Sequence, residues 1–145
     1  MFKFICLILF PMFLSAFEDI PPCYRDMQTT FFKPELVSQA ISTRVGYYQQ
    51  QNTWILITQE LTRRSQNIPQ IVKFKADQFR PSPLEFPFNA QLASQILFDT
   101  QYELFSSVLK SYGINDDTDI TAMFNFIRGS QEPMLRQCLG LPPAP

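Results

Sequence analysis

Apolar residues that recur at alternating steps of four and three positions dominate the second half of this chain. The clearest run consists of Phe98, Tyr102, Phe105, Leu109 and Tyr112. Because an α-helix turns once every 3.6 residues, this spacing places all five side chains on one helical face. Gly113 follows the run directly, and glycine is typical of a helix end. The pattern therefore predicts a long amphipathic helix, with Tyr102, Phe105 and Leu109 at the centre of the core.

Shorter apolar runs with helical spacing occur on both sides of this segment. One helix is expected to start at Pro34, because proline suits the first turn, and one is expected to end near Arg64. Another should start after Asn67, and a later one should end at Gly129. A last short turn is expected from Pro133. Gly46 either ends the first of these helices or lies within a longer one. Residues 54–57 could form a short strand, but no second strand candidate exists to pair with it. We therefore predict an all-α fold, a small bundle of four or five helices.

Prolines divide the chain into segments. Residues 81–87 contain three prolines, at positions 81, 83 and 87, and such a sequence cannot continue a helix. We expect this proline-rich break to separate two helical halves of one domain over residues 34–139. Two adjacent prolines at 21–22 also disfavour a helix, so residues 17–33 are expected to form an N-terminal strap. Residues 140–145 are expected to form a loose tail.

The first sixteen residues have the pattern of a secretory signal peptide. Lys3 precedes an apolar run, and the small residues Ser15 and Ala16 end it. The run is shorter than the roughly 20 residues that a membrane span needs. An uncleaved anchor or a buried helix is the alternative. We expect export of residues 17–145, either as a secreted protein or to the periplasm and cell envelope.

Removal of residues 1–16 would leave two cysteines. Cys6 departs with the signal segment, while Cys23 and Cys138 remain near opposite ends of the exported chain. An even cysteine count in an exported protein is most simply a disulfide. The alternative is a pair of free thiols that only pack. We predict a Cys23–Cys138 bond that closes the domain.

The sequence argues against several kinds of chemistry. It contains no histidine, which removes the commonest general base and the commonest zinc ligand. Acids between Asp116 and Asp119 fail the spacing of a calcium-binding EF-hand loop and suit the first turn of a helix. Asp99 and Glu103, four residues apart, are a distant candidate for a catalytic carboxylate pair. We expect no enzyme activity, no metal and no cofactor.

Charge is unevenly distributed along the chain. A basic segment holds five cations against one acid, Asp77; the cations are Arg63, Arg64, Lys73, Lys75 and Arg80. Residues 85–119 carry six acids against one cation, Lys110. The basic segment is a candidate contact for an anionic surface such as a membrane, without insertion. Alternatively, the two segments attract each other across the fold. The whole chain has a formal charge of −1, and we expect no nucleic-acid partner.

These patterns favour a non-catalytic binding or protein-interaction module of the cell envelope or exterior. Such a module needs an exposed apolar patch, for which residues 31–32 and 86–88 are candidates. The alternative is a carrier of an apolar small molecule in a cavity between helices. An enzyme that uses a carboxylate pair is a distant third hypothesis.

Overall fold

A computed structural model describes residues 21–44, 51–78 and 90–144 of the chain, and these form six helices and no strand. The helices are α2 (Pro22–Thr30), α3 (Pro34–Arg44), α4 (Gln51–Ser65), α5 (Ile68–Gln78), α6 (Ala90–Ser111) and α7 (Asp117–Leu139). The all-α class is confirmed, with more helices than the four or five that were predicted. The signal segment, Gly46 and the proline-rich break at 81–87 lie outside the described residues.

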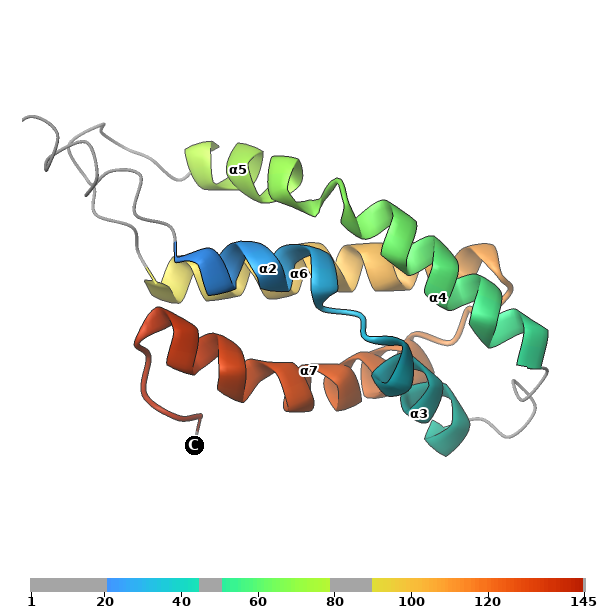
Figure 1. Ribbon diagram of the computed structural model, residues 1–145. Helices are drawn as coiled ribbons and strands as arrows, with labels where there is room; N and C mark the ends of the chain where they lie inside the picture. The colour runs from blue at the N-terminus through green and yellow to red at the C-terminus, as the bar shows by residue number, and fades with distance from the viewer. Residues whose placement is uncertain (1–20, 45–50, 79–89, 145) are drawn as a thin grey trace, which may run out of the picture.

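Two long antiparallel helices, α6 and α7, run side by side through the middle of the molecule (Figure 1). The shorter α2 lies in front of α6 in this view, and α4 and α5 follow one another along the upper edge. Helix α3 packs against α7 and α4, while α2 contacts α4, α5 and α7. Among the described helices, α6 therefore packs against α4 and α5, and α7 packs against α2 and α3.

An aromatic cluster forms the centre of the core. Phe105 is fully buried and stacks on Phe32 with ring centroids 5.5 Å apart. Phe31 stacks in the same way on Phe124 at 5.7 Å. The prediction is confirmed for Phe105 and Leu109, which are fully buried, whereas Tyr102 is only partly buried at the edge of the cluster. The suggestion that residues 31–32 form an exposed patch is wrong, because both rings are buried against α6 and α7.

The expected strap at residues 17–33 is a helix over most of its described part. Pro22 occupies the first helical position, where a missing N–H costs nothing, and Pro21 has the extended backbone of a residue that precedes a helix. Tyr24 and Met27 are buried, and the Tyr24 hydroxyl donates a hydrogen bond to the Ala93 carbonyl on α6 at 2.9 Å. The two prolines therefore start a helix here rather than prevent one.

Helix α7 begins as predicted but ends later. The Asp116 carboxylate caps it by accepting hydrogen bonds from the backbone N–H groups of Thr118 and Asp119. The predicted end at Gly129 and the separate turn from Pro133 are both wrong, since α7 runs through them to Leu139. Gln131 and Leu135 are buried on either side of Pro133, so packing holds the helix together where one backbone hydrogen bond is lost.

Both long helices end in the same way. Gly113 and Gly140 have φ angles of 87° and 71°, the left-handed conformation that glycine adopts without strain. After α6, the N–H groups of Gly113 and Ile114 donate to the carbonyls of Lys110 and Leu109. The buried Ile114 side chain completes this Schellman-type end. The predicted stop at Gly113 is confirmed.

Candidate functional site

A groove of about 500 Å³ lies where the end of α5 meets α6 and α7. Its lining combines aromatic, amide and charged side chains, namely Lys75, Gln78, Leu92, Gln95, Ile96, Phe98, Asp99, Tyr102, Glu103, Thr121, Phe124, Asn125 and Arg128. Cavities of this volume are typical of ligand sites. The groove is open to solvent rather than enclosed.

The floor of the groove is aromatic and continuous with the core. Phe98 and Phe124 are almost fully buried, and each has its ring centroid within about 6 Å of the Phe31 ring. Tyr102 is half-buried and meets Phe124 edge to face at 5.2 Å. Its hydroxyl lies 3.0 Å from the Thr121 hydroxyl on α7. These contacts fix the floor from beneath, because close-packed rings have few alternative positions.

Two ion pairs lie along the rim. Lys75 on α5 reaches Glu103 on α6, with 3.1 Å between Nζ and Oε1. On α7, the Arg128 guanidinium donates to Glu132 through Nε at 3.4 Å and Nη2 at 3.2 Å. The Arg128 guanidinium also lies over the Phe98 ring, 4.2 Å from its centroid. Four of the charged side chains are therefore neutralised in pairs before anything binds.

A second hollow of about 200 Å³ continues the groove toward the end of α7. Four residues line both hollows: Gln95, Phe98, Asp99 and Arg128. The second hollow adds Gln91, Ser94, Glu132, Arg136 and Leu141. Together the two hollows form one groove, called here the α6–α7 groove, that follows the outer surface of this helix pair.

The two carboxylates proposed as a catalytic pair both line this groove. Asp99 and Glu103 lie one helical turn apart on α6, as the spacing predicts. Both are exposed, and Glu103 is bound to Lys75. In the part of the chain that the structure describes, no cation lies within ion-pair distance of Asp99. The two acids are therefore in different electrostatic settings.

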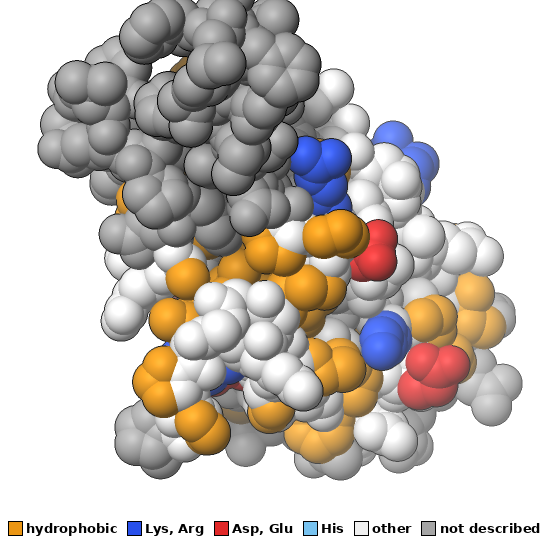
Figure 2. Space-filling view, turned by 60° about the vertical axis from the view of Figure 1, so that its left-hand side comes forward, with side chains coloured by type: hydrophobic (Ala, Val, Ile, Leu, Met, Phe, Trp, Pro, Cys, Tyr) orange, Lys and Arg blue, Asp and Glu red, His pale blue; other side chains and the backbone are white. Residues whose placement is uncertain are grey.

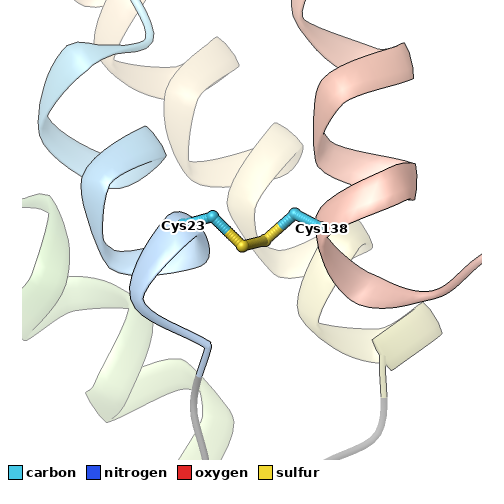
Figure 3. The surroundings of a disulfide bond; sticks show 2 residues. All are labelled: Cys23 and Cys138. Atoms are coloured by element: carbon cyan, nitrogen blue, oxygen red, sulfur yellow. A yellow bond between two sulfur atoms is a disulfide. The ribbon is translucent and has the colours of Figure 1, made fainter.

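The two cysteines predicted to pair lie side by side, although they are 115 positions apart in the sequence (Figure 3). Cys23 lies in the first turn of α2 and Cys138 in the last turn of α7. Their Cα atoms are 6.0 Å apart and their sulfur atoms 2.05 Å apart. The prediction that these two residues lie at disulfide distance is confirmed.

The basic segment does not form one continuous surface. Arg63 pairs with Glu60 on its own helix, and this hydrogen bond holds the pKa of Glu60 below its usual value. Arg64 approaches the Ser107 hydroxyl at 3.5 Å, and Lys75 faces α6. Lys73 is exposed on another side of α5. Arg80 lies outside the described residues.

Beside Lys73, the ring of Phe74 is 64% exposed and Ile71 is 40% exposed. Other large apolar side chains exposed in the described part of the chain are Ile55, Leu56, Tyr112, Phe126 and Met134. Figure 2 shows hydrophobic side chains on one face of the molecule, interspersed with basic and acidic ones. The basic segment is therefore accompanied by apolar contact area on α5, although its cations point in different directions.

Neither a metal cluster nor a membrane-spanning helix is found in the segments that the structure describes. Comparison with protein-family models, with curated proteins and with solved structures finds no match to this chain. Its function therefore has to be inferred from the residues themselves.

Most residues of the α6–α7 groove were not singled out by the sequence. A usable signal was present, because polar residues recur every four positions along α6, at Gln91, Gln95, Asp99 and Glu103. A similar polar row follows α7, at Thr121, Asn125, Arg128 and Glu132. Each row marks a solvent-facing stripe of one helix. The sequence does not show that the two stripes border the same groove, because that depends on how α6 and α7 pack.

Proposed function

We propose that the protein is an exported, non-catalytic interaction module and that its α6–α7 groove binds a segment of a partner protein. The observation that carries this proposal is the combination of an open groove of about 500 Å³, a floor held in place by the core, and a polar rim. A preformed surface of this kind binds without first being ordered, which favours affinity.

The rim carries side chains suited to a polypeptide backbone. Gln95 and Asn125 face the groove with amide groups, and Thr121 contributes a hydroxyl. Such groups both donate and accept hydrogen bonds, as the N–H and C=O groups of an extended peptide require. Leu92 and Tyr102, both half-buried, offer apolar contact beside them. This mixture favours a peptide segment over a purely apolar ligand.

The alternative hypotheses have less support from the groove. A carrier of an apolar small molecule needs an enclosed apolar cavity, whereas this groove is open and contains four charged side chains in its larger hollow. A carboxylate enzyme needs two acids that converge in a water-excluding cleft, whereas Asp99 and Glu103 are exposed. Contact with an anionic surface is supported by the exposed side chains of Phe74 and Lys73 on α5. Arg63 and Lys75 add less to such a contact, because each already has an acidic partner.

Export is supported by two independent features of the chain. Residues 1–16 have the order of a signal peptide, and Cys23 and Cys138 lie at disulfide distance. Disulfides persist in oxidising compartments outside the cytosol. Mass spectrometry of the native protein should find an N-terminus close to Phe17. Recovery of the intact chain from Met1 in a cytosolic fraction would contradict the proposed export.

Site-specific cross-linking tests the groove. A photoreactive residue at Gln95 should capture one defined partner from the native extracellular fluid, whereas the same group at Gln59, exposed on α4, should not. Asn125→Arg should fill the groove and abolish the capture, and Gln59→Arg is the matched control. Equal labelling from both positions, or capture that survives Asn125→Arg, would exclude the groove as the binding site.

A further inference from the structure

Charge along the α6–α7 groove is balanced except at two positions. Lys75 with Glu103, and Arg128 with Glu132, form neutral pairs. Asp99 lines both hollows and has no cation within ion-pair distance among the described residues. Among the carboxylates that line the groove, Asp99 is therefore the one without a cationic partner in the described part of the chain.

Arg136 is the complementary case at the other end of the groove. Its side chain lines the second hollow, and no acid within the described segments lies within ion-pair distance of it. Its Nε is buried and donates no hydrogen bond to that part of the chain. The buried Nε is out of reach of a partner, so a carboxylate would pair with the other two guanidinium nitrogens of this partly exposed side chain.

The distance between the two positions limits what can bridge them. Asp99 shares both hollows with Arg128. From Arg128 to Arg136 the rise along α7 is about 12 Å, at roughly 1.5 Å per residue. An extended peptide advances about 3.3 Å per residue and presents alternate side chains to one face. Two peptide residues that are four positions apart therefore lie about 13 Å apart on the same side, which is close to the rise along α7 from Arg128, the neighbour of Asp99 in both hollows, to Arg136.

We propose that the occupant of the groove is an extended partner segment with a basic residue and an acidic residue four positions apart. The basic side chain would pair with Asp99 and the acidic one with Arg136. This inference rests on the proposed function and adds the charge pattern of the partner. An extended segment fits better than a helix, because its backbone groups remain free to bond the amides of Gln95 and Asn125.

Synthetic peptides provide the test. Two seven-residue peptides should be compared, one with arginine second and glutamate sixth, the other with the reverse order, and both with serine and leucine between. Citrulline and glutamine replace the charged residues in the neutral control. Binding is followed by NMR through the side-chain amide signals of Gln95 and Asn125. We expect one order to bind, and the neutral peptide to bind about tenfold more weakly, as expected for two exposed ion pairs of up to about 1 kcal/mol each.

Matched variants assign each charge to its partner. Asp99→Asn should reduce affinity about threefold and remove the preference for arginine over citrulline, whereas Glu35→Gln, exposed on α3, should change neither. Arg136→Gln should remove the preference for glutamate over glutamine, with Arg25→Gln on α2 as its control. Asp99→Lys should reverse the preference at the basic position in favour of glutamate.

The outcomes separate this inference from the proposed function. Equal affinity for charged and neutral peptides, or no shift with either order, would overturn the charge pattern. Undiminished capture through Gln95 in the double variant Asp99→Lys/Arg136→Glu would also overturn the charge pattern. In that case the groove would still be the binding site. Absence of any capture through Gln95 would instead refute the proposed function.

Discussion

Two glycines that terminate or interrupt the long helices should respond in opposite ways to the same substitution. Gly129 lies on the exposed side of α7, and a Cβ atom built there meets no heavy atom within 4 Å. Glycine inside a helix costs about 0.8–1 kcal/mol relative to alanine. Gly129→Ala should therefore raise the free energy of unfolding by about 1 kcal/mol. Pro133, one turn later, cannot bond the Gly129 carbonyl in either protein, so this defect is unchanged.

Gly113 also has open space around its Cβ position, but its φ angle is 87°. The left-handed conformation costs an alanine about 1–2 kcal/mol. Alanine also lowers the conformational entropy of the unfolded chain, which offsets about 0.4–1 kcal/mol of this cost. Gly113→Ala should therefore lower the free energy of unfolding by about 1 kcal/mol, which places the two variants about 2 kcal/mol apart.

Guanidinium denaturation with the disulfide intact measures both effects. The midpoint should rise for Gly129→Ala and fall for Gly113→Ala, with the slope of the transition unchanged. In thermal unfolding each change corresponds to a shift of about 3–6 °C for a domain of this size. Equal shifts in one direction, or a destabilised Gly129→Ala, would refute the claim that α7 is a regular helix through this position.

Three further predictions concern the core and its covalent closure. Phe105→Ala should cost about 3–5 kcal/mol, whereas Phe126→Ala, at a ring that is 40% exposed, should change stability by about 0.5 kcal/mol in the same denaturation assay. Replacing Cys23 and Cys138 together by alanine should cost about 4–5 kcal/mol for a loop of 115 residues; mass mapping of the freshly isolated protein should find neither thiol open to alkylation. Burial raises the pKa of Tyr24 from 10.0 to about 12, so folding favours the protonated phenol, and stability should be unaffected below pH 10 and fall between pH 10 and about 12. Denaturation of Tyr24→Phe across this pH range should show a smaller loss of stability, because the contribution of the Tyr24 phenol is absent.

The fold was predictable where one local signal dominates. The four-and-three spacing from Phe98 to Leu109 specifies the buried face of α6, and Gly113 specifies its end, because both depend on neighbours in the sequence. Prolines were less reliable guides. Pro22 and Pro133 both lie in helices, since the first occupies a position that needs no N–H and the second lies between buried residues.

The groove was not predictable, because it depends on the packing of two helices. The sequence shows that Asp99 and Glu103 share a face of α6, but not that Lys75 approaches one of them and leaves the other unpaired. It also does not show that Arg128 lies over Phe98, thirty positions earlier in the chain. Such pairings follow from the antiparallel alignment of α6 and α7, and the periodicity of either helix alone does not determine this alignment.

The side of α6 that faces α2 explains how the groove keeps its shape. Gln101 is fully buried, and its amide donates to the Gln28 carbonyl on α2 at 3.0 Å. Tyr24, also on α2, bonds the Ala93 carbonyl of α6. The same α2 lies at disulfide distance from the end of α7 through Cys23. Buried hydrogen bonds hold the α6 wall of the groove to α2, and Cys23 on α2 lies at disulfide distance from the α7 wall, so a partner segment would meet a site that needs little rearrangement.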